Sequence, residues 1–533
     1  MNATPGPDRK RVAAADPLPP VDSSELDVHR QASDFLFMAL LLVILTRLAF
    51  ILLPRVPVET KAVASIGDSG EYIALARNLV AHHTFSRDVA PPWRPELFRT
   101  PAYPLLLTIP YIINQPASLG PRRGLYPLRL PRFILFSLIL QFLLSMLTVW
   151  LTWRLGLELE LGPVPAALAA LLVGLSPNLA FLSSKLISEA LFIPLLLIFV
   201  LLFNRFRSTG RAADIIAAGI CTGLLILTRP IATFFPLLLA VYIFWLAARR
   251  RKWVTGISNA VLLLAVTSVT ILPWVIRNGV RTGRYIISTA SEHNVYLYDA
   301  ATVLAAENGT TIAQARDSMM AQAVRQFGQI DTNDEATMWQ KLAAVARPHL
   351  LRRPALAASV WLMGVAEDFV SPISMGPLLI HAGGLPAQGS ANLFQSSLGL
   401  LAKGKVIQAF RTAWQVRLSG ASTFILAVLA LAALFNFILI MFGLVSLFLR
   451  RTRGLLWLLL PILYFTLVTG TVGDARFRAP IEPLLCFFAA VALIRPPRPA
   501  PSRTQAQPVR RTANLDEGSC SVGLAQPGIR PTA

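Results

Sequence analysis

The sequence has few charged residues and almost no cysteine. Asp, Glu, Lys and Arg together make up 14% of its 533 residues, against roughly a quarter in soluble globular proteins. So low a charged fraction excludes a set of ordinary water-soluble domains, because too few polar side chains are present to cover their surfaces. Three cysteines, at positions 221, 486 and 520, exclude a secreted scaffold held together by disulfides.

Several common functional motifs are also missing. The sequence contains no Walker loop, no glycine-rich dinucleotide turn and no nucleophile elbow, so ATP-driven chemistry is not expected. Its six histidines show no metal-ligand spacing. The formal net charge of +21 does not indicate nucleic-acid binding, because many of the cations stand beside apolar runs, where orientation signals and lipid headgroups account for them.

Long hydrophobic runs dominate what remains. Hydrophobic residues make up 54% of the chain, and the mean hydropathy is +0.58. Runs of about 20 apolar residues are long enough to cross a bilayer as helices. The sequence therefore predicts an all-α integral membrane protein with about ten transmembrane helices. We expect them at 35–53, 133–153, 164–184, 186–204, 212–228, 230–248, 253–276, 418–449, 454–473 and 479–494.

The distribution of cations among the short loops predicts the orientation. Eleven cations, from Arg154 to Arg453, fall in loops on one side, and four fall in the short loops on the other. Because cytosolic loops carry the excess of Lys and Arg, the first side is predicted to be cytosolic. Ten spans then place both termini in the cytosol, as a disordered tail at 1–33 and a basic, proline-rich tail at 495–533. We expect the protein to lie in the inner or plasma membrane.

Two long outer segments interrupt the series of spans. Residues 54–132 divide spans one and two within the membrane region 34–276, and residues 277–417 separate that region from the last spans, 418–494. Segments of this length are usually functional or disordered. We expect an amphipathic helix at 72–81, a short apolar element at 105–113, helices at 311–326 and 335–347, and an interfacial helix at 355–371.

Asp68 and Glu71 are the leading candidates for catalysis. They stand three residues apart in Gly67-Asp68-Ser69-Gly70-Glu71-Tyr72, directly before the amphipathic helix. Two carboxylates at the outer edge of a membrane suit general-base work on an acceptor hydroxyl. The same spacing also fits a capping box with Asp68 at the N-cap and Glu71 at N3. Both interpretations stay open, because a cap also fixes a side chain in place.

Four arginines are candidates for binding a phosphate. Arg99, in Arg99-Thr100-Pro101-Ala102-Tyr103-Pro104, is held with Tyr103 by two prolines, and its guanidinium could fork onto phosphate oxygens or extend toward headgroups. Arg476 and Arg478 flank a Phe before the last span. They too could bind a phosphate or lie among lipid headgroups. Arg229 follows an apolar run and, with Glu189, could also form an internal ion pair that holds spans together.

Taken in order, these motifs resemble the C-type membrane glycosyltransferases, over about 30–495. The nearest branches are the bacterial protein O-mannosyltransferase and lipid A aminoarabinose transferase-like families. The resemblance rests on the first-loop motifs around Asp68 and Arg99 and on four later ones. These are Ser188-Glu189-Ala190-Leu191, Thr228-Arg229-Pro230, Leu272-Pro273-Trp274-x-x-Arg277-Asn278 and Arg476-Phe477-Arg478-x-Pro480.

The resemblance implies a polyprenyl- or dolichyl-phosphate sugar donor and a site on the non-cytosolic face. It implies that Asp68 is the base, with Glu71 assisting. From their positions in the loops, we expect Arg99, Arg229, Arg476 and Arg478 to bind the donor phosphate. Tyr72, Tyr103, Glu189 and Arg277 are expected to line the cavity. In the related oligosaccharyltransferases a divalent metal binds loop acids; here Asp68 and Glu71 are the only clear pair, so we expect no cofactor and do not favour a metal.

We therefore predict an inverting transfer of a sugar from a polyprenyl-phosphate donor to a lipid, glycan or protein acceptor on the outer face. The segment 280–417 matches the family little beyond Ser291 to Tyr298, so the acceptor stays open. The alternatives are an O-antigen ligase or polymerase, whose main sites lie on a late loop, and a transporter or flippase of lipid-linked sugars, which predicts internal repeats.

Overall fold

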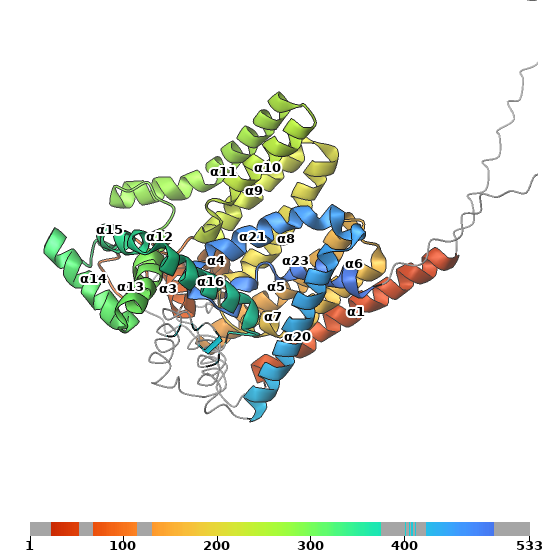
Figure 1. The fold of residues 1–533 in the computed structure, drawn as a ribbon, viewed down its shortest axis with the longest axis horizontal. Coiled ribbons are helices and arrows are strands. Elements are labelled where there is room, and N and C mark those ends of the chain that lie inside the picture. Colours follow the sequence, from red (N-terminus) through yellow and green to blue (C-terminus); the bar gives the residue numbers. More distant parts are fainter. Residues whose placement is uncertain are drawn as a thin grey trace, which may run out of the picture. The chain divides into compact units, whose positions relative to one another are not determined.

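The computed structural model describes residues 23–52, 68–114, 130–374 and 423–494, with a few isolated positions between 400 and 411. Every regular element within these ranges is a helix, which confirms the predicted all-α fold (Figure 1). Gly67 and most of the predicted tails lie outside the described residues, as do parts of the two long outer segments. These parts are 53–67, 115–129, 375–399 and nearly all of 401–422.

Six described helices are long and apolar enough to cross a membrane, judged by length and composition. Each overlaps a predicted span, because a long run of apolar residues satisfies its backbone in lipid only as a helix. The first begins within the stretch predicted as a tail, so polar residues from Ser23 onward continue this helix beyond its apolar part. The six are α1 (Ser23–Leu52), α5 (Leu130–Glu158), α8 (Glu189–Thr209), α10 (Phe235–Arg249), α11 (Trp253–Thr282) and α20 (Thr423–Leu447).

Three further predicted spans form shorter apolar helices. They are α9 (Ala212–Thr228), α21 (Leu459–Val468) and α23 (Glu482–Leu493). A 3₁₀ helix, Arg450–Leu458, leads into α21, and a 3₁₀ turn from Gly470 to Val472 follows it. Gly470 has φ +68°, a left-handed conformation that ends a helix and that an apolar count does not reveal.

The predicted span 164–184 is bent. It consists of α6 (Pro163–Leu175) and α7 (Pro177–Ser183), which meet at 55°. The break lies at Ser176 because the following proline lacks an N–H and disfavours helical backbone before it. The Ser176 side chain then caps α7, accepting the backbone N–H of Leu179 at 3.1 Å. If this pair counts as one crossing, seven described segments could span a membrane.

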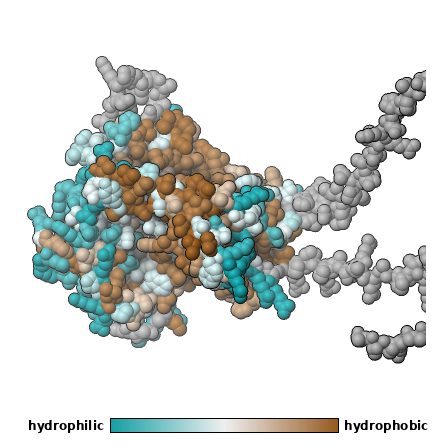
Figure 2. All heavy atoms as spheres, turned by 90° about the horizontal axis from the view of Figure 1, so that it is seen from above, coloured by the Kyte–Doolittle hydropathy of each residue, from teal (hydrophilic) through white to brown (hydrophobic). Residues whose placement is uncertain are grey.

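The apolar helices pack as neighbours around a core rich in phenylalanine. Helix α1 packs on α6, α5 on α6 and α8, α9 on α8 and α11, and α20 on α23. Their outward faces also stay apolar: on α20, Leu431 is 65% and Phe437 is 62% exposed (Figure 2). A surface of this kind is unfavourable in water and suits contact with lipid. The buried phenylalanines include Phe199, Phe203, Phe235, Phe465 and Phe487.

The described helices of the segment 277–417 that follow α11 pack around a small core and are drawn in green in Figure 1. They are α12 (Ala290–Asn294), α13 (Ala301–Asn308), α14 (Ile312–Phe327), α15 (Glu335–Arg352) and α16 (Pro354–Val370), with a π-helical turn from Val295 to Ala300. Tyr296, Met319 and Leu342 belong to a small core between them. The predicted helices at 311–326, 335–347 and 355–371 are thus all present.

Candidate active site

Helix α3 (Asp68–His82) carries Asp68 and Glu71 in its first turn. The amphipathic helix predicted at 72–81 lies within α3. Its buried face packs against α4 (Ala102–Ile113), where the rings of Tyr72 and Tyr103 meet edge to face with centroids 4.8 Å apart. The Tyr72 hydroxyl also donates to Ser188 Oγ at 3.2 Å, directly before α8. These contacts fix the two carboxylates relative to the apolar helices.

Two arginines hold the Asp68 carboxylate, one on each oxygen. Arg99 Nη2 donates to Oδ1 at 2.6 Å, and Arg476 Nη2 lies 2.8 Å from Oδ2. Arg99 also donates from Nε to Glu71 Oε2 at 2.6 Å, so one guanidinium joins both carboxylates of α3. Asp68, the first residue of α3, is thus engaged in ion pairs with both arginines.

Glu189 is the second acid to which Arg476 is bound. Its side chain is 1% exposed at the start of α8, and Arg476 contacts both of its oxygens, with Nη2 donating to Oε2 at 3.1 Å. The Nη1 atom of Arg229, the residue directly after α9, lies 2.5 Å from Glu189 Oε1. The internal ion pair between Glu189 and Arg229 that the sequence left open is therefore present.

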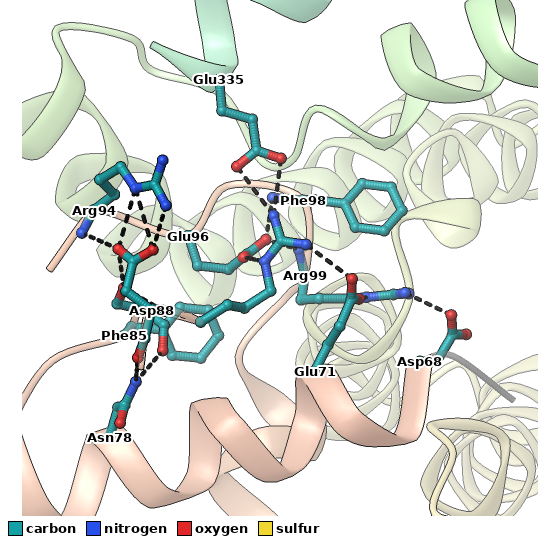
Figure 3. A network of polar contacts seen from close by, with 12 residues as sticks. Asp68, Glu71, Asn78, Phe85, Asp88, Arg94, Glu96, Phe98, Arg99 and Glu335 are labelled. Atoms are coloured by element: carbon teal, nitrogen blue, oxygen red, sulfur yellow. Dashed lines mark hydrogen bonds and ion pairs between the residues drawn. The ribbon is translucent and has the colours of Figure 1, made fainter. Parts of the chain in front are cut away.

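Together these residues form a continuous series of alternating charges, which we call the ion-pair chain. It joins five separate parts of the sequence: α3, the loop before α4, the start of α8, the end of α9 and the short helix α22 (Ala475–Arg478). Three carboxylates face three guanidinium groups, so the formal charge of the series is zero. Figure 3 shows the end of the series at Glu71, where Glu71 and Asp68 point from α3 toward Arg99. The ion-pair chain is Glu71–Arg99–Asp68–Arg476–Glu189–Arg229.

The neighbouring charges shift the proton affinity of Asp68. Burial raises the pKa of this carboxyl, but Arg476 and Arg99 outweigh burial and bring the pKa well below its usual range. The pKa of Arg476 is raised, because Glu189 and Asp68 more than offset the cost of its burial. In this arrangement Asp68 is fully ionised and holds a proton only weakly.

Arg87 connects α3 to the second outer segment. Its Nη1 donates to Glu71 Oε1 at 2.8 Å, and its Nη2 donates to Glu335 Oε1 at 3.0 Å, at the start of α15. Arg87 also forms an ion pair with Glu96, which is 2% exposed. One guanidinium therefore joins carboxylates from α3, from the first outer loop and from α15.

Glu96 shapes the loop that presents Arg99. Its Oε1 accepts the backbone N–H groups of Phe98 at 2.7 Å and of Arg99 at 2.8 Å. Burial raises the pKa of Glu96 even though the nearby Arg87 opposes the shift. A buried carboxylate that accepts two backbone donors fixes the turn, so Glu96 sets the position from which Arg99 reaches the carboxylates of α3.

The sequence interpretation missed Arg87, Glu96 and Glu335. Glu96 could have been found, since an acid three residues before Arg99 in a proline-flanked loop is placed to cap the turn. Nothing local marks Glu335 as a partner of Arg87, because the two are 248 residues apart.

Arg478 lies outside the ion-pair chain. Its side chain is 1% exposed and is bound to main-chain oxygens in the last turn of α16 and just after it: Nη1 donates to the carbonyls of Asp368 at 2.7 Å and Ser371 at 2.9 Å, and Nη2 donates to that of Pro372 at 3.2 Å. Its Nε lies 3.5 Å from Glu482 Oε2. The last carbonyls of a helix lack intrahelical donors, so a buried arginine satisfies them. The structure thus places Arg478 at the end of α16, away from Asp68.

Arg277 anchors the first outer loop to α11. Its Nη1 donates to the carbonyl of Glu96 at 2.9 Å and its Nη2 to that of Phe85 at 3.0 Å. The guanidinium also lies over the rings of Phe85 and Trp274, at 5.5 and 4.9 Å from their centroids. The predicted lining residues are therefore divided: Tyr72, Tyr103 and Glu189 lie along the ion-pair chain, whereas Arg277 supports the loop behind it.

The acids of this region are arranged for arginine rather than in a metal-ligand cluster. Across the described residues, no three side chains of His, Cys, Asp or Glu gather as metal ligands would. Asp68 and Glu71, the pair considered from the sequence, share Arg99 between them.

Comparison with known proteins gives one family match and several distant structural likenesses. No curated protein matches the sequence significantly. Archaeal oligosaccharyltransferase AglB from Archaeoglobus fulgidus, solved with an inhibitory peptide and a dolichol-phosphate, is similar at 16% identity and a TM-score of 0.44, over 87% of this chain and 50% of that chain. This chain therefore spans about half the length of that oligosaccharyltransferase.

ArnT from Cupriavidus metallidurans, solved with undecaprenyl phosphate, is similar at 11% identity and a TM-score of 0.36, over 86% of this chain and 78% of that chain. The family model described as dolichyl-phosphate-mannose-protein mannosyltransferase matches residues 135–276, a range that holds Glu189 and Arg229. Over 135–276 the chain thus carries the sequence pattern of that mannosyltransferase family, which confirms over this range the resemblance to C-type membrane glycosyltransferases.

Proposed function

We propose that this protein is an integral-membrane glycosyltransferase that moves a sugar from a polyprenyl-phosphate donor to an acceptor hydroxyl. The acceptor belongs to a lipid, a glycan or a protein. The family match over 135–276 supports the class of reaction. The observation that carries the proposal is the Asp68 carboxylate held between two arginines, Arg99 and Arg476. A carboxylate and two guanidinium groups in contact supply both the base and the phosphate ligands that such a transfer requires.

In the proposed reaction, Asp68 accepts the proton of the acceptor hydroxyl. The acceptor oxygen attacks the anomeric carbon of the sugar, and the bond from this carbon to the phosphate oxygen breaks. The lipid phosphate leaves with the bonding electrons, and one direct displacement inverts the anomeric configuration. A general base in hydrogen-bond reach typically gives about 10²–10⁴-fold in rate. A phosphate leaving group needs no acid to protonate it, so a single base suffices.

The low pKa of Asp68 suggests how donor binding activates this base. While Arg99 and Arg476 hold its carboxylate, Asp68 is a poor proton acceptor, because a good general base has a pKa near the working pH. A donor phosphate can accept hydrogen bonds from the same two guanidinium groups, bidentately. As they turn from Asp68 to the phosphate, the pKa of Asp68 rises. The base is thus released only when the leaving group is in place.

The other members of the ion-pair chain have supporting roles in this proposal. Glu71 keeps Arg99 in reach of the phosphate, since it is itself held by Arg87. Glu189 does the same for Arg476, and Arg229 balances the charge of Glu189 when Arg476 turns away. Removal of Glu189 would leave Arg229 without its carboxylate and Arg476 with Asp68 alone, which is unfavourable for two largely buried cations.

The test compares two substitutions in the same outer loop. Asp68→Asn keeps the size of the side chain but removes the base, so sugar transfer from radiolabelled polyprenyl-phosphate sugar by reconstituted protein should fall about 10²-fold or more. Asp88→Asn is the matched control, because Asp88 is paired with the exposed Arg94 at 2.6 Å. Near-normal transfer by Asp68→Asn would reject the base. Labelled lipid that crosses the bilayer without covalent transfer would reject the transferase.

We also propose that the ion-pair chain faces the outer side of the membrane and that both termini are cytosolic. The count of eleven cations against four in the short loops supports this orientation. In a Cys520→Ser background, Ile312→Cys should react with a membrane-impermeant thiol reagent added to intact cells, and Arg251→Cys should not. The remaining cysteines, Cys221 and Cys486, are buried. Labelling at position 251 instead of 312 would reverse the orientation.

A further inference from the structure

The Tyr103 hydroxyl is a buried polar group without a hydrogen-bond partner. The side chain is fully buried in the first turn of α4, and its oxygen forms no hydrogen bond with any described residue. A hydroxyl in this state lowers the stability of the fold, because it has lost its water and nothing replaces it. Native structures contain few such groups, so the Tyr103 hydroxyl requires an explanation.

The packing of Tyr103 does not explain its hydroxyl. Its ring meets that of Tyr72 edge to face, and both belong to a small apolar cluster. The other members of this cluster are Ala76, Leu107 and Leu191. A phenylalanine has the same ring and would fill the same space. The oxygen atom is thus not needed for this packing, and its surroundings indicate what else it does.

Glu189 and Arg476 are the charged groups that act on this hydroxyl. Tyr72, which packs on the Tyr103 ring, donates to Ser188 Oγ at 3.2 Å, directly before α8. Burial raises the pKa of the Tyr103 hydroxyl. Tyr72 and Glu189 raise this pKa further, while Arg476 opposes the shift. The hydroxyl therefore keeps its proton near neutral pH and can donate a hydrogen bond in the neighbourhood of Glu189.

The two carboxylate oxygens of Glu189 are held differently. Oε1 contacts both Arg229 and Arg476, whereas Oε2 accepts a hydrogen bond from Arg476 Nη2 alone among the described residues, at 3.1 Å. When Arg476 turns toward a phosphate, as in the proposed function, Oε1 keeps Arg229 but Oε2 loses its hydrogen bond. The Glu189 side chain is 1% exposed, so little water reaches this oxygen. A buried carboxylate oxygen without a hydrogen bond opposes the exchange.

We propose that Tyr103 is a positioning residue whose hydroxyl donates to Glu189 Oε2 when Arg476 turns toward the substrate. The inference rests on the proposed function, because the exchange of Arg476 is a step of it. In the present arrangement Arg476 occupies Oε2, which explains why the hydroxyl has no partner. In the exchanged arrangement both groups are satisfied at once. Tyr103 thus acts through Glu189 and Arg476 and does not itself touch the substrate.

The test is Tyr103→Phe in the full-length solubilised protein. This change keeps the ring and removes only the hydroxyl. The dissociation constant for the probe, a polyprenyl phosphate, should rise about tenfold, the scale of one hydrogen bond to a charged group. kcat/KM for sugar transfer should fall by a similar factor. Without lipid, the variant should unfold at an equal or higher temperature, because it loses only an unpartnered hydroxyl.

Tyr111→Phe is the matched control on the same helix. Tyr111 is also buried on α4, but its ring belongs to a different cluster, with Phe133 and Leu186. The same loss of one phenolic oxygen should there leave both the dissociation constant and kcat/KM within about twofold of wild type.

A second background tests whether Tyr103 acts through Arg476. In Arg476→Met, Oε2 of Glu189 lacks its arginine whether or not the lipid is bound, so the Tyr103 hydroxyl donates to it in both states. Adding Tyr103→Phe should then leave the affinity of Arg476→Met within about twofold and lower its unfolding temperature. Non-additivity of this kind is the signature of two residues that share a partner.

Three results would overturn the proposal. Equal lipid binding by wild type and Tyr103→Phe would leave the hydroxyl without a role in the exchange. A lower unfolding temperature of lipid-free Tyr103→Phe, or its failure to fold, would show that the hydroxyl is already bonded in the resting protein. A tenfold loss of affinity in the Arg476→Met background as well would make Tyr103 independent of Arg476. Lipid binding by wild type without sugar transfer would reject the proposed function, while the comparison of affinities still decides the role of Tyr103.

Discussion

Two groups of partly or fully buried arginines occupy neighbouring parts of this molecule. Arg99 and Arg476 are held by carboxylates, whereas Arg277 and Arg478 donate mainly to main-chain carbonyls, Arg478 having in addition a long ion pair of 3.5 Å with Glu482. A guanidinium shared by two carboxylates can turn from one of them toward an incoming phosphate. The carboxylate that it leaves stays partly balanced when a second cation is nearby, as Asp68 is by Arg99 and Arg476. A guanidinium that satisfies buried carbonyls cannot leave without orphaning them. The partner thus separates an arginine suited to exchange from one that holds the fold.

Arg476 and Arg478 offer the most direct way to break this comparison, and the largest expected effect. Arg476→Lys replaces a planar fork by a point charge that cannot bridge Asp68 and Glu189. We expect kcat/KM for sugar transfer to fall about 10- to 100-fold, which corresponds to about 1.5–3 kcal/mol for hydrogen bonds to charged groups.

Arg478→Lys is the matched variant two residues away. It should lower the unfolding temperature because carbonyls after α16 lose their donors, while kcat/KM of the folded protein stays within about twofold. The comparison fails if Arg478→Lys reduces kcat/KM as strongly as Arg476→Lys does.

A smaller effect is expected where the ion-pair chain meets the second outer segment. Glu335→Gln removes one of three carboxylates around Arg87, so Glu71 and Arg99 should be held less firmly. Ion pairs of this partial exposure contribute about 0–1 kcal/mol, so kcat should fall up to about fivefold. Glu307→Gln, which breaks an ion pair with the exposed Arg353 on the same segment, is the control. Equal kcat values for the two variants would show that Glu335 serves the fold alone.

The last prediction concerns stability rather than rate, at Asp368, a buried acid near Arg478. Burial raises its pKa to about 7, although the Asp474 backbone N–H and the Thr469 hydroxyl oppose the shift. An acid whose pKa is raised in the folded state stabilises the fold at low pH. That stability is lost between about pH 4 and pH 7, by at most about 1.4 kcal/mol per pH unit.

Asp368→Asn should remove this dependence. Unfolding temperatures measured at pH 5 and pH 8 should differ less for the variant than for wild type. Unchanged pH dependence in the variant would mean that Asp368 is ionised in the folded protein at both pH values.

The sequence predicted the helices well because length and hydropathy are local properties. Helices α5, α8, α11 and α20 each follow a run of apolar residues that needs no distant partner. The break at Ser176 was missed even though Pro177 is visible in the sequence, because the apolar run continues across it. Local conformation also determines which residues reach the site. The sequence interpretation gave Arg476 and Arg478 the same role, but the structure places only Arg476 next to Asp68.

Helix α22 explains why these two arginines diverge. In a helix, two residues that are two positions apart are rotated by about 200° about the axis, so their side chains leave on nearly opposite faces. Arg476 therefore faces Asp68, while Arg478 faces α16. The motifs around Asp68, Arg99, Glu189, Arg229 and Arg476, taken in order, did indicate which distant elements supply the charged groups of the ion-pair chain. The partners of each charge depend on tertiary contacts such as that between Arg87 and Glu335, which the sequence does not encode locally.

The zero formal charge of the ion-pair chain has a consequence for how the protein encounters its donor. An unpaired cluster of arginines would attract anions over about one Debye length, and this attraction would weaken as salt is added. A series in which every guanidinium already faces a carboxylate exerts little such pull. Capture of a charged lipid then depends on lateral diffusion within the bilayer and on the exchange of short contacts. For the proposed transferase, the ion-pair chain itself therefore adds little dependence on ionic strength to this two-dimensional encounter.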